Sequence, residues 1–156
     1  MKNSIKVDLQ IAVKNIFYPK KKDFVLWVNS VCNSVCEGAD VRGEVCIRIV
    51  TSNEIQALNK TYRNKNNATN VLSFNYESYK EEKKSLIGDI AICAEVVNSE
   101  AIDKKISPQA HWAHIVIHGV LHLFGYDHEN EAQANIMEQK EAAILHSLGF
   151  SDPYLC

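Results

Sequence analysis

Three histidines in the C-terminal half of the chain have the spacing of a metal site. His118 and His122 are four residues apart in an apolar stretch with helical periodicity, which would place their imidazoles one turn apart, about 6 Å along the axis. Gly125 follows closely and lets the chain turn, because glycine adopts positive φ without a steric penalty. That turn can bring His128 back toward the pair. The pattern therefore predicts one metal ion held by His118, His122 and His128.

A set of three imidazoles indicates a catalytic metal ion. A tetrahedral ion with three protein ligands keeps its fourth position open, whereas structural zinc sites are usually closed by four. Such an ion acidifies a water molecule and so supplies a nucleophile for hydrolysis near neutral pH. Zn²⁺ suits this set, and other divalent transition metals such as nickel or iron also accept imidazole. His111 and His114 continue the same helix face, where we expect a surface or supporting role and not direct ligation.

The residue after the first ligand argues against peptide hydrolysis. The histidine spacing resembles that of the metzincin zinc proteases, which need a glutamate general base directly after the first histidine. Gly119 occupies that position here, so hydrolysis by that mechanism lacks its proton acceptor.

Arg63 is the candidate catalytic residue for a reaction that builds negative charge. Phosphodiester cleavage places charge on phosphoryl oxygens, and the planar guanidinium group is well shaped to bind them. Arg63 ends a helical pattern and precedes an Asn- and Lys-rich segment at 64–70, with Lys60 and Lys65 as further positive charges. A surface arginine at a helix C-terminus explains the same position equally well.

Hydrophobic periodicity predicts the elements that must position these residues. Thr51 and Glu54 have the spacing of a capping box, and Ser107 followed by proline is typical of the start of a helix. Glycine ends the last two helical patterns. We expect strands at 4–10, 43–50, 71–76 and 86–93, a charged connection at 80–84, and helices at 23–36, after Thr51, and at 95–104, 107–124 and 130–148.

Length and composition fit one globular domain. The chain has 156 residues, of which 46% are hydrophobic and 23% charged, with a net charge of −2; it can bury a core without disulfides. Strands interleaved with helices, followed by a helical tail, predict a single domain over 1–156 of the α+β class (α/β layered). In it a small mixed sheet is covered by helices, and the metal site lies on a helix of the C-terminal half.

Several features favour a cytoplasmic protein. No apolar run approaches the roughly 20 residues of a membrane helix, so we expect no membrane partner. The first residues are charged and then alternate, unlike a secretory signal. The five cysteines are an odd number, which suits reduced thiols.

Three blocks of sequence resemble the YbeY-type rRNA maturation factors. The most specific is His118-Gly-Val-Leu-His122-Leu-Phe-Gly-Tyr-Asp-His128. The other two are Leu58-Asn-Lys-Thr-Tyr-Arg63 with Thr69-Asn-Val-Leu-Ser-Phe74, and Gly88-Asp89-Ile90. The resemblance covers about 44–150, with the blocks in the family's order.

This resemblance implies a single-strand-specific endoribonuclease with one zinc ion. Its metal ligands correspond to His118, His122 and His128, and its functionally important arginine to Arg63. It implies a role in 16S rRNA 3′-end maturation and ribosome quality control, with single-stranded RNA, rRNA and the ribosome or small ribosomal subunit as partners. The implied fold is a mixed, mostly parallel sheet covered by helices.

Two other functions stay open at this point, as do the roles of two acidic residues. The protein could be another zinc hydrolase of the peptidase type, or a ribosome-associated factor with a structural metal. Asp89 lies between apolar strand neighbours, where an unpaired charge is costly; it could orient a ligand histidine or cap a turn. Asp127 is the expected N-cap of the last helix, with a supporting role beside the metal ligands as the alternative.

Overall fold

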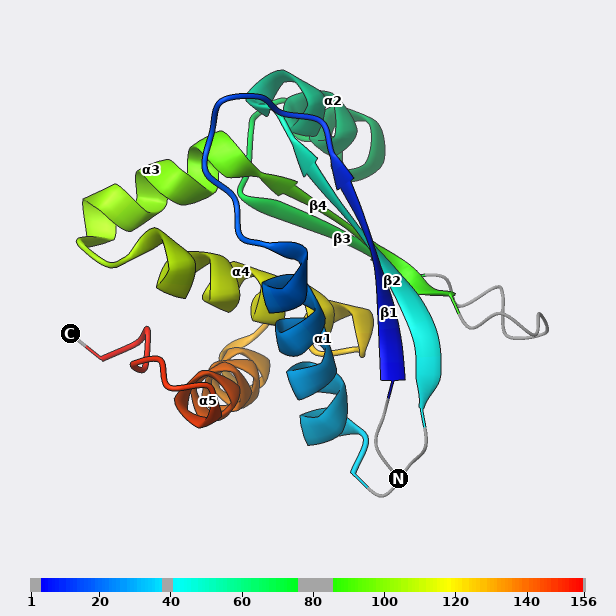
Figure 1. Ribbon diagram of the computed structural model, residues 1–156, viewed down its shortest axis with the longest axis vertical. Helices are drawn as coiled ribbons and strands as arrows, with labels where there is room; N and C mark the ends of the chain where they lie inside the picture. The colour runs from blue at the N-terminus through cyan, green and yellow to red at the C-terminus, as the bar shows by residue number, and fades with distance from the viewer. Residues whose placement is uncertain (1–3, 38–40, 76–85, 156) are drawn as a thin grey trace.

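A four-stranded mixed sheet organises the protein, with helices on both of its faces (Figure 1). The computed structural model describes residues 4–37, 41–75 and 86–155. Its elements are β1 (Ser4–Ile11), α1 (Lys21–Val35), β2 (Arg42–Val50), α2 (Ser52–Arg63), β3 (Val71–Asn75), β4 (Leu86–Cys93), α3 (Ala94–Lys104), α4 (Pro108–Leu123) and α5 (Glu131–Ser147). The predicted α+β class and small mixed sheet covered by helices are confirmed.

Strand direction gives the sheet one antiparallel edge. The spatial order is β1-β2-β4-β3; β1, β2 and β4 run parallel, and β3 pairs antiparallel with β4. Alternation sends Val45, Ile47 and Ile49 of β2 into the main core. Cys46 and Arg48 consequently face the other side of the sheet, because successive side chains point to opposite faces.

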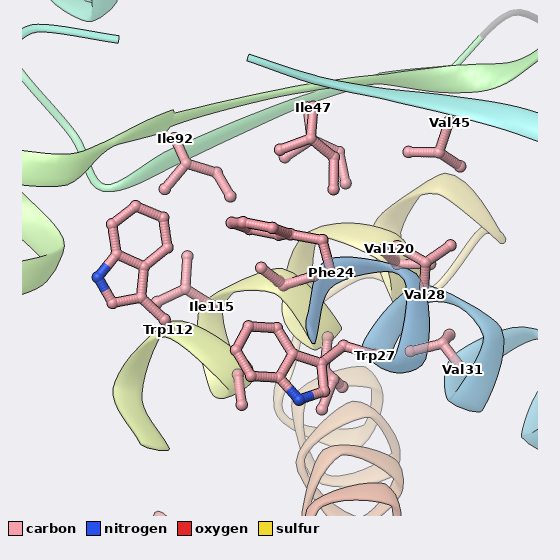
Figure 2. Packing of buried hydrophobic residues seen from close by; sticks show 14 of the residues in the cluster. Phe24, Trp27, Val28, Val31, Val45, Ile47, Ile92, Trp112, Ile115 and Val120 are labelled. Carbon is pink, nitrogen blue, oxygen red and sulfur yellow. The ribbon is translucent and has the colours of Figure 1, made fainter. Parts of the chain in front are cut away.

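The main core lies between the sheet and the helices α1 and α4 (Figure 2). Phe24 of α1 packs edge-to-face against Trp27 and Trp112, with ring centroids 5.8 and 6.1 Å apart. Trp112 keeps its indole N–H satisfied by donating to Asn98 Oδ1 at 2.7 Å. Such aromatic pairs contribute about 0.5–1.5 kcal/mol each beyond area burial, so this cluster fixes α4 beneath the sheet.

Helix α4 is buried over most of its length and carries the histidine pattern. Ser107 caps its start by accepting a hydrogen bond from Ala110 N at 3.1 Å, and Pro108 occupies the first turn. Proline is well tolerated there because the first N–H groups of a helix have no internal partner. After the helix ends, Gly125 adopts φ +97°, the left-handed conformation expected of a glycine at a helix C-terminus.

The element boundaries predicted from sequence agree with the structure to within a few residues, with exceptions at the caps. Thr51 accepts from Glu54 N at 3.2 Å, but the Glu54 carboxylate binds Arg48 at 2.7 Å and does not complete a capping box. The N-cap of α5 is Asn130, which accepts from Gln133 N at 2.9 Å. Residue 76 and the charged connection at 80–84 lie outside the described residues. Within the described ranges, no helix combines the length and apolarity needed to cross a membrane.

Candidate metal centre and its cleft

His118, His122 and His128 come together at the C-terminal end of α4. The Nε2 atoms of His118 and His122 are 3.1 Å apart. The His128 ring lies 5.4 Å from the His118 ring and 5.0 Å from the His122 ring, measured between centroids. One nitrogen from each of the three imidazoles lies within 4.8 Å of the other two. The turn at Gly125 thus brings His128 back to the helical pair.

The donor set fits a small divalent cation. Zinc–nitrogen bonds of about 2.0–2.1 Å place two ligand nitrogens of a tetrahedral ion roughly 3.3 Å apart, close to the 3.1 Å between His118 and His122. Burial, reinforced by the neighbouring His118 and His128, lowers the pKa of His122 to about 4. The ring is therefore neutral at physiological pH, and a metal ion binds the neutral form of imidazole.

A buried carboxylate on α5 lies beneath the cluster. Glu141 has no exposed surface, and its Oε2 accepts a 2.6 Å hydrogen bond from His118 Nδ1. Its Oε1 accepts from His114 Nε2 at 2.9 Å and from the Tyr154 hydroxyl. Burial by itself would raise the pKa of Glu141, but the hydrogen bonds from His114 and His118 lower it to about 2. Glu141 is therefore a carboxylate, and it can only accept hydrogen bonds.

A second histidine–carboxylate pair lies earlier on α4. His111 is buried and its Nε2 lies 2.9 Å from Glu100 Oε1 of α3. Burial lowers the pKa of His111, although the hydrogen bond to Glu100 acts in the opposite direction. His111 and His114 are not part of the three-histidine cluster, which agrees with the prediction that they are not ligands. The alternative that they lie on the surface is wrong, because both side chains are buried.

The cluster opens into a polar cleft of about 910 Å³. The cleft is lined by the C-terminal end of α2, the segment leading into β3, β3 itself and the turn after α4. Its lining includes Asn59, Arg63, Lys65, Asn67, Asn70, Ser73, Tyr126 and Asp127 beside the three histidines. Amide, hydroxyl and cationic groups thus surround the site, a surface suited to a polar, anionic ligand. Lys60 is not part of this lining.

Arg63 is held at the cleft by β3. Its Nη2 donates to the backbone carbonyl of Ser73 at 2.7 Å, and its guanidinium lies 5.5 Å from the centroid of the Phe74 ring. Tyr62 packs edge-to-face on the same ring at 5.3 Å. The sequence favoured neither of two interpretations of Arg63, a catalytic residue or a surface residue at a helix C-terminus. The structure brings Arg63 and the three histidines into one cleft.

The structure excludes one of the roles considered for each of the two acidic residues. Asp89 lies on the opposite face of the sheet, in a pocket of about 510 Å³ that it shares with Cys46 and Arg48, so it does not orient a ligand histidine. The prediction that Asp127 caps α5 is wrong, since Asn130 does so. Asp127 instead accepts from the backbone N–H of its neighbour His128 at 2.8 Å.

Known proteins with similar sequences place this chain in a family. Residues 10–149 match the family described as Endoribonuclease YbeY. The chain belongs to the YbeY endoribonuclease family. The Endoribonuclease YbeY of Buchnera aphidicola subsp. Baizongia pistaciae (strain Bp) is 44% identical over 156 residues, which cover 99% of both chains. The solution structure of TM1509 from Thermotoga maritima has a similar fold, with a TM-score of 0.55 and 22% identity over 97% of this chain and 99% of that one.

Membership of the YbeY family makes the protein an endoribonuclease, a hydrolase that acts on RNA. The predicted family resemblance is therefore confirmed. Sequence reasoning missed Glu141 and Ser73 as partners of the site. Glu141 had no distinguishing neighbour in a charged helical segment, and Ser73 was only one letter of a quoted motif. The one available signal was the position of Glu141 on the apolar stripe of Met137 and Ile144, because a carboxylate is rarely buried without a partner.

Proposed function

We propose that the protein is a cytoplasmic zinc-dependent endoribonuclease that cleaves single-stranded RNA, and that it acts in 16S rRNA 3′-end maturation and ribosome quality control. The observation that carries this proposal is the shared cleft of Arg63 and the three histidines. Membership of the endoribonuclease family supports the reaction class. The sequence resemblance described above supports the rRNA substrate and the small ribosomal subunit as partners.

His118, His122 and His128 are the proposed ligands of the ion. When bound, a zinc ion supplies Lewis acidity toward a phosphoryl oxygen or a water molecule. His118 presents Nε2 to the cluster because its Nδ1–H is engaged by Glu141. His128 is exposed at the opening of the cleft, where it can meet both ion and substrate. Another divalent transition metal with an affinity for imidazole would satisfy the same ligands.

Arg63 is the proposed catalytic residue. Its Nη2 is anchored on Ser73, which leaves other N–H groups of the five-donor guanidinium available for a phosphate. A fixed cation aimed at the scissile phosphate stabilises the charge that develops in the transition state. Lys65 at the same cleft adds attraction for the RNA backbone, and Tyr126 offers a ring on which an unpaired base can stack.

The structure weakens the peptidase alternative on steric grounds. A Cβ at Gly119 would lie 3.2 Å from Ser73 Oγ, 3.3 Å from Val71 Cγ2 and 3.4 Å from Ile90 Cδ1. Helix α4 therefore packs against β3 and β4 at the position where metzincins carry their glutamate. A side chain at 119 would require these neighbours to shift by a few tenths of an ångström, so a glutamate could not be added there without strain.

The test is cleavage of an end-labelled single-stranded RNA from the 16S 3′ region by zinc-loaded protein. We expect cleavage of the single strand, little cleavage of the same sequence in a duplex, and loss of activity with chelator and in Arg63→Ala. Arg48→Ala is the matched control, because Arg48 lies on the opposite face of the sheet. Folded, zinc-loaded protein that leaves the RNA intact would favour the ribosome-bound factor with a structural metal. Equal loss of activity in both arginine variants would contradict the role of Arg63.

A further inference from the structure

Glu141 lies in the protein interior, where an uncompensated carboxylate would destabilise the fold. It comes from the middle of α5, 23 residues after His118 in sequence, and its surface is completely buried. A buried ion must be compensated by hydrogen bonds or opposite charges. Glu141 accepts from three donors, His114, His118 and Tyr154. Its two oxygens are therefore both engaged.

The two oxygens of Glu141 have separate partners. Oε2 accepts from His118 Nδ1 at 2.6 Å, the short distance of a charge-assisted hydrogen bond. Oε1 accepts from His114 Nε2 and from the Tyr154 hydroxyl. His114 Nδ1 has no hydrogen-bond partner among the described residues, so the proton of that ring belongs on Nε2. His114 and Tyr154 thus hold the carboxylate in the orientation that His118 requires.

The bond to Glu141 decides which nitrogen of His118 is free. Because a carboxylate only accepts, His118 carries its proton on Nδ1, and Nε2 keeps an unshared electron pair. That Nε2 is the atom 3.1 Å from His122 Nε2, inside the cluster. Ligand histidines commonly donate their other N–H to a carboxylate, which fixes the tautomer and the ring orientation.

The chain after α5 folds back to complete this arrangement. Gly149 adopts φ +88°, and Phe150 N donates to Leu145 O at 2.9 Å. The turn returns Tyr154 to α4, where its ring packs edge-to-face on His114 with centroids 5.5 Å apart. The Tyr154 ring thereby lies over Glu141, and the Tyr154 hydroxyl donates a hydrogen bond to the Glu141 carboxylate.

We propose that Glu141 is a positioning residue that holds His118 as an Nε2 ligand, with His114 and Tyr154 fixing the carboxylate. This inference rests on the metal site proposed above. Glu141 touches neither substrate nor ion in this scheme; it acts through His118. Loss of such a partner typically lowers metal affinity by about 10- to 100-fold.

Glu141→Gln is the main variant, because the amide keeps the size of the side chain and removes the charge. We expect its zinc affinity, measured by competition with a chromogenic chelator, to fall by about 10- to 100-fold while circular dichroism shows an intact fold. Glu100→Gln is the matched control, since it alters the other histidine–carboxylate pair, which the buried His111 of α4 forms with the partly exposed Glu100 of α3. Its zinc affinity should change by less than about twofold.

The tautomer of His118 gives a second readout that does not depend on any variant being folded. Long-range ¹H–¹⁵N spectra of the wild-type protein should show His118 protonated at Nδ1, both with and without zinc. Glu141→Gln should weaken or lose this preference. A wild-type His118 protonated at Nε2 in the zinc-free protein would overturn the inference.

The outcomes separate this inference from the proposed function. If the wild type binds zinc and His118→Ala does not, while Glu141→Gln binds as tightly as the wild type, the metal site stands and the role of Glu141 is refuted. Equal losses of affinity in Glu141→Gln and Glu100→Gln would indicate a general structural effect and also refute it. If the wild type does not bind zinc at all, both proposals fall.

Discussion

The Ser73 hydroxyl donates a 3.1 Å hydrogen bond to the backbone carbonyl of Gly119. Ser73 thus connects both halves of the site, because its own carbonyl accepts from Arg63 at 2.7 Å. Gly119 lies directly after His118, a proposed metal ligand, on α4. The distance between the arginine and the histidine cluster is therefore set through one residue of the edge strand β3.

Ser73→Ala should impair cleavage more than stability. A typical hydrogen bond contributes about 0.5–1.5 kcal/mol net, so we expect the free energy of unfolding to fall by about 1 kcal/mol. We expect the cleavage rate of the folded, zinc-loaded variant to fall roughly tenfold, because small errors in position are expensive in catalysis. Urea denaturation and RNA cleavage measure the two effects. Ser30→Ala, which removes a hydroxyl bonded to Leu26 O in α1, should leave cleavage unchanged; if it lowers the rate equally, the bridge is not the cause.

Gly88→Ala should destabilise the fold beneath the histidine cluster. An added Cβ would lie 2.5 Å from Phe74 O and 2.6 Å from Leu123 Cδ2. Overpacking of this kind costs about 1–3 kcal/mol, and urea denaturation should show a loss in that range. Leu123→Ala removes the Cδ2 atom and so relieves the 2.6 Å contact. In a Leu123→Ala background, Gly88→Ala should therefore lower the free energy of unfolding by less. Simple additivity of the two changes would exclude Leu123 as the obstacle.

Zinc should stabilise the folded protein, and chelation should reverse the effect. A ligand at 100 times its dissociation constant raises the free energy of unfolding by about 2.7 kcal/mol when it binds the native state alone. Thermal unfolding with zinc and with chelator measures this difference. His122→Ala should abolish it, whereas His146→Ala should retain it, since His146 is exposed on α5 away from the cluster. Undiminished stabilisation of His122→Ala would place the zinc elsewhere.

His111 should make the fold sensitive to mild acid. Burial lowers its pKa below the ordinary value of 6.5, so below about pH 6.5 the unfolded state binds more protons than the native state. Stability contributed by neutral His111 is therefore present above pH 6.5 and is lost as the pH falls toward the native pKa. The difference in free energy of unfolding between wild type and His111→Gln should shrink between pH 7.5 and pH 5.5 in urea titrations. A difference that stays constant or grows on acidification would contradict the burial effect.

Local sequence periodicity was sufficient to predict the helices and strands and part of the candidate site. Alternation placed β1 and β2, and the pairing of His118 with His122 followed from helical geometry. Ser107 and Gly125 marked the ends of α4 because capping and positive φ depend on adjacent residues. The cap of α5 was misassigned to Asp127 because several polar residues precede that helix, and their side chains compete for the same N–H groups.

The sequence by itself determined the helix, the turn and the three histidines, since each depends on hydrogen bonds and dihedral angles within a few residues. The tertiary structure decided which distant groups meet this cluster. Glu141 reaches His118 across 23 positions, and Arg63 reaches the cleft through Ser73 of β3. Those contacts follow from the packing of α5 and β3 against α4, and burial of apolar surface is non-directional. Periodicity identifies a buried face but does not specify its partner, so only the assembled fold brings these residues to the site.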